Sequence, residues 1–162
     1  MTALRLDLGC GSWCRGDVGV TLASHASVVD ATVGCDPVLE RYGWVHDPEA
    51  EVIYADVEDV GAWFEERFRG SRVLLSHALE HMRRPRDLLA FLARPLRAAE
   101  VIIVVPDAEV NRADWHDHEH LYSWTEGSMR NLVGLFFEVE ECRRILGRDL
   151  LCRATPQRGA PG

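Results

Sequence analysis

Apolar and polar residues alternate along this chain in short blocks, and most of these blocks have the length of a β-strand. Apolar runs that stop at Gly, Pro or Asp predict strands at residues 5–8, 31–35, 51–55, 72–75 and 101–105. The run at 101–105 has apolar residues on both faces and is closed by Pro106, so we expect it to be buried within a sheet. Two further apolar blocks, at 137–145 and 150–154, are joined at Gly147 and predict a closing antiparallel hairpin.

Helical spacing of apolar residues falls between these predicted strands. It predicts helices at residues 60–69, after Pro85, and at 126–136. Residues 13–27 are ambiguous, because Gly16 and Gly19 weaken a helix while Val18 and Val20 alternate as in a strand. We predict a helix there.

The alternation of strands and helices predicts the fold class. Repeated strand-helix units require right-handed crossovers, which give a parallel sheet covered by helices, with ligands at the carboxyl ends of the strands. We therefore expect an α/β chain with a Rossmann-like, mostly parallel, doubly wound sheet and a C-terminal antiparallel hairpin. Residues 1–154 are expected to form one domain, and residues 155–162, rich in Pro and Gly, a disordered tail.

Composition narrows the functional classes. The 162 residues are 47% hydrophobic and 27% charged, and no run approaches the roughly 18 apolar residues of a membrane span. The first residues lack the pattern of a secretory signal, so a cytoplasmic location is expected. A net charge of −8 disfavours nucleic acid as a partner. Five cysteines without a CxxC pair predict reduced thiols rather than disulfides or a zinc ribbon.

The first predicted strand runs into a glycine turn, Leu6-Asp7-Leu8-Gly9-Cys10-Gly11. This segment resembles the first motif of class I S-adenosylmethionine (SAM) dependent methyltransferases. The resemblance implies that SAM binds at the turn and leaves as S-adenosylhomocysteine. It also implies that an acid ending the second strand binds the ribose and that an acid after the third strand meets the adenine. The cofactor residues expected on this basis are Asp7, Gly9, Cys10, Gly11, Asp36, Pro37, Asp56 and Val57.

Two later segments extend the resemblance. Residues 76–81, Ser-His-Ala-Leu-Glu-His, look like the segment after the fourth strand in the small-molecule, type 11-like branch of that family, which adds Ser76 and His77 to the expected cofactor set. Residues 117–125 are similar to a D-x-x-H-x-x-x-(W/F)-T stretch that precedes the last helix in many of these enzymes. The implied activity is methyl transfer to a small-molecule acceptor.

The sequence leaves the acceptor open among a sugar, a quinone-like ring, a small acid and a protein side chain. If the acceptor is a hydroxyl, a base must remove its proton. Histidine has a pKa near neutrality and suits that task. His81 is the first candidate, followed by His120 and Asp107, and His81 and His120 are expected to approach one cavity from two loops. No metal is expected.

Several alternatives remain open. Trp13 stands where the family usually has a small residue, and the interval from Gly11 to Asp36 is long. In another register residues 17–20 form the second strand, Thr21 takes the position of the ribose acid, and Asp36 lies in a loop. The chain is alternatively a SAM-binding subunit that is inactive or depends on a partner.

Two histidine patterns permit a metal. His77, Glu80 and His81 spell HxxEH, which on one helix face is a zinc-peptidase arrangement. His116, His118 and His120 alternate and would face one way on an extended segment. We interpret these last three as residues that line or cap the mouth of the substrate site.

Overall fold

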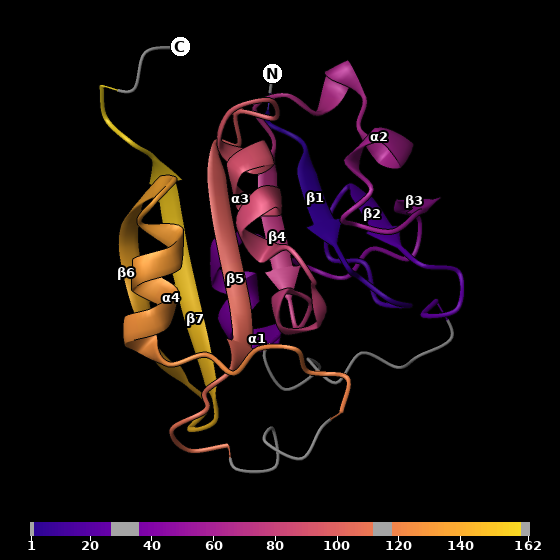
Figure 1. Cartoon of the computed structure of the whole chain (residues 1–162). Coiled ribbons are helices and arrows are strands. Elements are labelled where there is room, and N and C mark those ends of the chain that lie inside the picture. Colours follow the sequence, from indigo (N-terminus) through magenta and orange to yellow (C-terminus); the bar gives the residue numbers. More distant parts are fainter. Residues whose placement is uncertain (1, 27–35, 112–117, 160–162) are drawn as a thin grey trace.

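The fold is a single twisted sheet with helices on both faces (Figure 1). The computed structural model describes residues 2–26, 36–111 and 118–159. The described strands form one seven-stranded sheet in the order β3-β2-β1-β4-β5-β7-β6. The strands are β1 Arg5–Leu8, β2 Val18–Thr21, β3 Glu51–Tyr54, β4 Arg72–Ser76, β5 Glu100–Pro106, β6 Phe137–Ile145 and β7 Asp149–Pro156. β1 to β5 are parallel, and β7 pairs antiparallel with both β5 and β6, so the predicted fold class is confirmed.

The helices of the described chain are short. The α-helices are α1 Asp36–Leu39, α2 Val60–Trp63, α3 Pro85–Ala93 and α4 Glu126–Val133, and the 3-10 turns are η2 Glu40–Tyr42, η3 Glu66–Phe68 and η4 Leu79–His81. α3 begins with Pro85, whose fixed φ suits the first helical position. α4 begins with a capping box, in which Thr125 and Ser128 each accept a hydrogen bond from the other's backbone amide. No helix in the described residues is both long and apolar enough to cross a bilayer.

The main core fills the face of the sheet that α3 and α4 cover, in front of the strands in Figure 1. Alternate residues of the central strands, such as Leu75, Ile103 and Val105, point to this face because side chains alternate along a strand. Leu89 of α3 and Met129 of α4 pack against them with no exposed surface.

The opposite face carries a smaller core under α1 and the segment that follows it. Leu74, Ile102 and Val104 point to this side and contact Leu39 and Trp44. A layer of arginines and aromatic rings closes this face at its edge. Arg72 and Arg153 each bind Glu100 at 2.6 Å, and their guanidinium groups lie over the rings of Trp44 and Tyr42, respectively.

β3 is the edge strand of the sheet on the β1 side. It has only four residues and is exposed on both faces, and Tyr54 is the most exposed of its large side chains at 63%. Glu51, the first residue of β3, pairs with Arg67 at 2.6 Å.

The second strand is the main departure from the sequence prediction. The predicted helix at 13–27 is wrong, because Val18–Thr21 is a strand that pairs in parallel with both β1 and β3. The two glycines that made this segment ambiguous allow close packing. A Cβ at Gly16 would lie 2.5 Å from the carbonyl oxygen of Arg5, and one at Gly19 would lie 2.6 Å from the sulfur of Cys10. β1 and β2 are therefore joined by a loop at 9–17 that contains no helix.

Other boundaries differ less. The predicted helix at 60–69 consists of α2 and then η3, and α4 ends at Val133 instead of residue 136. β7 continues two residues into the predicted tail, because Pro156 pairs with Phe137. The strand predicted at 31–35 lies outside the described residues.

Candidate functional site

The glycine turn after β1 is built from strained backbone that glycine tolerates. Gly9 and Gly11 have φ values of 85° and 58°. The amide of Gly9 donates to the carbonyl oxygen of Val20 at 2.7 Å, which ties the turn to β2. A Cβ at Gly9 would lie only 2.7 Å from that of Ala78 in the segment after β4, so this glycine allows the two loops to approach.

Asp7 is buried beneath this turn, with 1% of its surface exposed. One of its carboxylate oxygens accepts a hydrogen bond from the backbone amide of Arg15 at 2.8 Å. Asp7 therefore fixes the course of the loop at 9–17. Cys10, the central residue of the turn, points inward onto Gly19.

The strand next to β1 does not end on an acid. The prediction that Asp36 ends the second strand is wrong, because β2 ends at Thr21 and Asp36 and Pro37 begin α1. The alternative register is therefore the one observed. Thr21 is 2% exposed, and its carbonyl oxygen accepts a hydrogen bond from the amide of Ala55.

Asp56 and Val57 follow β3, as the prediction requires. The Asp56 carboxylate is exposed and accepts a hydrogen bond from the amide of Glu58 at 2.9 Å. Val57 is buried, and its carbonyl oxygen accepts from the indole of Trp63. Asp56 thus stands at a turn on the surface beyond the carboxyl end of β3.

Ser76 and His77 lie where β4 ends. Ser76 is 4% exposed, and its hydroxyl has no hydrogen-bond partner among the described residues. His77 adopts a φ of 50°, and its ring lies between two buried carboxylates, 3.5 Å from Glu80 and 3.6 Å from Asp149. The ring therefore links the segment after β4 to β7.

Asp107, just after β5, is 1% exposed and held on two sides. Its carboxylate accepts from Arg144 of β6 at 2.6 Å and from the backbone amide of Glu109 at 3.0 Å. These bonds fix the carboxylate in the turn that follows β5. The ion pair with Arg144 gives Asp107 a positioning role that the sequence did not indicate.

His81 and His120 meet from two different loops. Their rings are edge to face, with centroids 4.6 Å apart and planes at 76°. Backbone bonds hold the two loops together, because the carbonyl oxygen of Glu80 accepts from the amides of Leu121 and Tyr122 at 2.8 and 3.3 Å. The side-chain Nδ1 of His81 lies 3.0 Å from the carbonyl oxygen of Glu119. The structure thus brings these two predicted residues together.

Glu80 belongs to the same group, although the sequence placed it only in the HxxEH pattern. Its side chain has no exposed surface, and potential ligand atoms of Glu80, His81 and His120 all lie within 4.8 Å of one another. The HxxEH residues do not share a helix face, because Leu79–His81 is a 3-10 turn and His77 precedes it with a left-handed backbone. His116 lies outside the described residues, and His118 is exposed.

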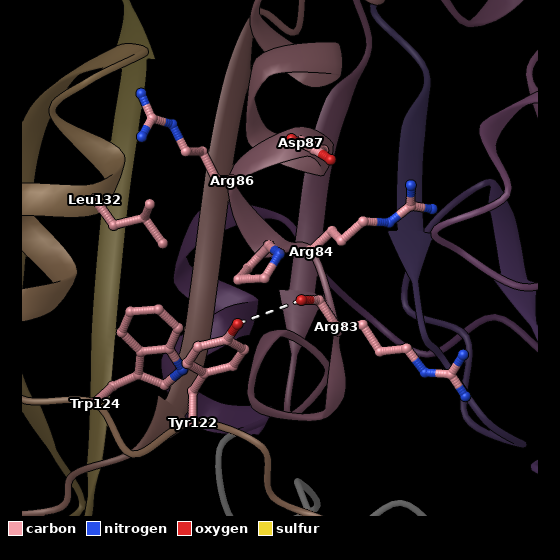
Figure 2. Close-up of a pocket in the computed structure, with 8 residues that line it drawn as sticks. Arg83, Arg84, Arg86, Asp87, Tyr122, Trp124 and Leu132 are labelled. Carbon is pink, nitrogen blue, oxygen red and sulfur yellow. Dashed lines mark hydrogen bonds between the residues drawn. The ribbon is translucent and has the colours of Figure 1, made fainter.

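A cavity of about 450 Å³ opens between the start of α3, Leu132 of α4 and the segment of Tyr122 and Trp124 (Figure 2). His81 and His120 are not among its lining residues. Its central walls are Pro85, Tyr122, Trp124 and Leu132. The hydroxyl of Tyr122 donates to the carbonyl oxygen of Arg83 at 3.3 Å across one end. The guanidinium groups of Arg83, Arg84 and Arg86 point outward from the apolar centre in Figure 2.

Comparison with solved structures places this fold among methyltransferases. A chain of the Haloferax volcanii complex of the Trm112 methyltransferase activator with its methyltransferase superposes with a TM-score of 0.66 at 14% identity, covering 98% of this chain and 83% of that chain. A SAM-dependent methyltransferase from Listeria monocytogenes gives 0.61 at 14%, covering 95% and 91%. The small RNA methyltransferase HEN1 gives 0.64 at 12%, covering 98% and 24%. No family model and no curated protein matches the chain.

These similarities establish the fold. The seven-stranded, mostly parallel sheet with its antiparallel C-terminal pair matches a Rossmann-like methyltransferase fold.

Proposed function

We propose that this chain is a SAM-dependent methyltransferase that acts on a hydroxyl group of a small-molecule acceptor. The observation that carries the proposal is the meeting of His81 and His120 at the carboxyl edge of β4 and β5. In open α/β sheets this edge is where ligands bind.

The residues around the glycine turn fit SAM in part. The turn lets backbone approach a ligand closely, and the buried hydroxyl of Ser76 offers a donor and an acceptor at the end of β4. Asp56 is available beyond β3 for the adenine amino group. No carboxylate stands at the end of β2 to bind the ribose of SAM, because this strand ends at Thr21. We therefore assign the ribose contact to Thr21 in place of Asp36.

When bound, SAM supplies a methyl group attached to a sulfonium sulfur, and the rest of the molecule leaves as S-adenosylhomocysteine once the methyl group is transferred. The new bond joins this methyl to the acceptor oxygen, and the hydroxyl proton must leave. His81 and His120 contact the acceptor in this proposal and assist the loss of that proton, while Asp107, held by Arg144, positions the loop after β5. The protein's contribution is orientation and exclusion of water.

The size and lining of the cavity support a small acceptor. A volume of about 450 Å³ lies within the usual range of small-molecule sites, and Tyr122 and Trp124 offer flat apolar surface. The net charge of −8 argues against RNA, although one protein of this fold is a small RNA methyltransferase.

The test is turnover of SAM to S-adenosylhomocysteine, followed by mass spectrometry, with a panel of hydroxylated small molecules and with RNA. His81→Ala is expected to lower the rate by about 10²- to 10⁴-fold with a hydroxyl acceptor. SAM affinity and melting temperature, measured on the same preparation, should change little. A large drop in melting temperature with a normal rate per folded molecule would show that His81 serves the fold instead.

A second candidate is a SAM-binding subunit that is inactive or requires a partner. The absence of an acid at the end of β2 favours it, and one protein of this fold is in a complex with an activator. SAM binding without turnover on any acceptor in the panel would support this candidate over the first.

A further inference from the structure

Glu80, His81 and His120 form a compact group whose side chains converge from two loops. The carboxylate is buried, His120 is half-buried and His81 is exposed, so the group runs from the interior to the surface. Its ligand atoms lie within 4.8 Å of one another. A tetrahedral ion holds its ligand atoms roughly 3.4 Å apart, so the three side chains would close by about 1 Å or less around a bound cation. We propose that these three residues bind one divalent transition-metal ion and that the ion holds the oxygen of the methyl acceptor.

The ligand types select the kind of metal. Imidazole nitrogens suit Zn²⁺, Fe²⁺, Ni²⁺ and Cu²⁺, whereas Mg²⁺, Ca²⁺ and Mn²⁺ prefer sites made of oxygen atoms. Two histidines and one carboxylate supply three protein ligands and leave at least one position open, as in catalytic zinc sites. His81 is exposed, so an acceptor could reach an ion bound by the three residues from the side of this histidine.

The surrounding bonds orient the histidines as metal sites require. A ligating histidine usually donates its second ring nitrogen to a carbonyl or a carboxylate, which fixes the tautomer. His81 has such a contact, because its Nδ1 lies 3.0 Å from the carbonyl oxygen of Glu119. Donation from Nδ1 leaves the lone pair on Nε2. The amides of Leu121 and Tyr122 bind the carbonyl oxygen of Glu80 and hold His120 near His81 without a metal.

Charge also favours a cation here. The buried Glu80 carboxylate supplies a negative charge, which attracts a cation more strongly in a protein interior than in water. His77 lies on one side of Glu80 at 3.5 Å, and a metal ion between Glu80, His81 and His120 adds positive charge on another.

With the ion bound, His81 and His120 would act on the acceptor through the metal instead of contacting it directly, and the metal would explain how the proposed reaction loses its proton. A hydroxyl bound to a divalent metal releases its proton far more readily than one in water. The acceptor O–H bond would break and its proton would pass to solvent. The oxygen would bond to the methyl carbon as the sulfur–methyl bond of SAM breaks, which releases S-adenosylhomocysteine. This inference rests on the proposed function for its acceptor, but the metal site itself does not depend on that function.

Metal binding is tested with the metal alone. Chelator-treated protein is titrated with Zn²⁺ and Mg²⁺ by calorimetry and with Co²⁺ by visible absorption. We expect one Zn²⁺ or Co²⁺ per chain and much weaker binding of Mg²⁺. His120→Ala and His81→Ala should each weaken Zn²⁺ binding by at least roughly 10- to 100-fold, because each removes a ligand and even the loss of a hydrogen-bond partner of a ligand has an effect of that size. The matched control is His118→Ala, an exposed histidine two residues from His120, which should keep the wild-type affinity.

Two controls and a third ligand variant distinguish loss of the metal site from unfolding and from metal binding to cysteine. Melting temperatures of the variants exclude unfolding as the cause, and Glu80→Gln provides a third ligand variant that preserves side-chain volume. The Co²⁺ spectrum separates imidazole and carboxylate ligands from cysteine sulfur, which adds an intense charge-transfer band. Zn²⁺ affinity that is unchanged in the His81→Ala, His120→Ala double variant would overturn the site, as would a sulfur-bound Co²⁺ spectrum.

Turnover then separates this inference from the proposed function. Activity that a chelator abolishes and Zn²⁺ or Co²⁺ restores supports both. Metal binding at the three residues without any methyl transfer would overturn the proposed function and the acceptor role while leaving the metal site in place. Methyl transfer in chelated protein, with no metal bound, would overturn the metal inference and leave the function standing.

Discussion

The Cβ of Ala78 occupies the space that a side chain on Gly9 would need, since a Cβ built on Gly9 would lie 2.7 Å away from it. Gly9→Ala is therefore expected to lower the free energy of unfolding by roughly 2–4 kcal/mol, the sum of left-handed backbone strain and overpacking. Chemical denaturation measures this loss.

Two further variants separate the causes at Gly9. Gly70 also has a positive φ, of 73°, but a Cβ there would meet no atom within 4 Å. Gly70→Ala should thus show the backbone strain alone, about 1–2 kcal/mol. Adding Ala78→Gly to Gly9→Ala should recover part of the loss. Equal losses in Gly9→Ala and Gly70→Ala would mean that the contact with Ala78 relaxes without cost.

SAM affinity should depend on Thr21 and not on Asp36. Thr21→Val removes one neutral hydrogen-bonding group at the end of β2 and should weaken SAM binding by about 2- to 10-fold. Asp36→Ala should change the Kd less than about twofold, because Asp36 begins α1 and does not end a strand beside β1. Calorimetric titration measures both. A tenfold loss in Asp36→Ala would restore the ribose role predicted for that acid.

Asp17 should make stability depend on pH through Arg5. The Arg5 guanidinium, which donates to Asp17 at 2.7 Å, lowers the pKa of that carboxyl group below its ordinary value. A lowered carboxyl pKa stabilises the fold above the unfolded pKa, near 4, and the contribution is lost as the pH falls through the folded pKa. Asp17→Asn should therefore lower stability at pH 7, by about 1 kcal/mol or less because solvent screens this partly exposed pair.

Thermal unfolding across pH 7 to pH 3 tests this dependence on Asp17. The difference between wild type and Asp17→Asn should shrink as the pH falls below about 4 toward the lowered folded pKa, because the Asp17 carboxylate is then progressively protonated. A difference that stays constant over this range would assign the effect to packing and not to the charge.

The buried cysteines should react with a thiol reagent more slowly than exposed thiols do. Burial and a hydrogen bond with Cys14 raise the pKa of the Cys10 thiol, and burial with a bond to Cys142 raises that of Cys152. Both should react with a disulfide reagent at pH 8 roughly tenfold or more slowly than after denaturation, because the thiolate is the reactive form. Mass spectrometry of labelled peptides identifies the sites. Rapid labelling of Cys10 in the folded protein would show that the loop at 9–17 opens readily.

Hydrophobic patterning predicted most of the sheet, because β4 and β5 are buried runs and the C-terminal hairpin is marked by Gly147. It failed at β2. Gly16 and Gly19 were interpreted only as residues that weaken a helix, whereas their role is to let the loop at 9–17 lie against the strands. Such contacts depend on residues far along the chain, so a local pattern does not reveal them.

The candidate site, like the sheet, could be predicted from the sequence only in part. The meeting of His81 and His120 was predictable, because loops after neighbouring parallel strands leave the sheet at one edge. The participation of Glu80 was not predictable, since the sequence does not show that the turn after β4 directs this carboxylate inward. The pairing of Asp107 with Arg144 depends on the position of β6, which periodicity does not fix.

The arrangement of β3 bears on how the protein behaves at high concentration. The outer backbone edge of this strand has no neighbouring strand in the described chain, and exposed backbone of that kind can template pairing between molecules. Its shortness and the charged pair of Glu51 and Arg67 oppose such pairing. These two side chains thus protect the chain against self-association, in a part of the sheet remote from the histidines.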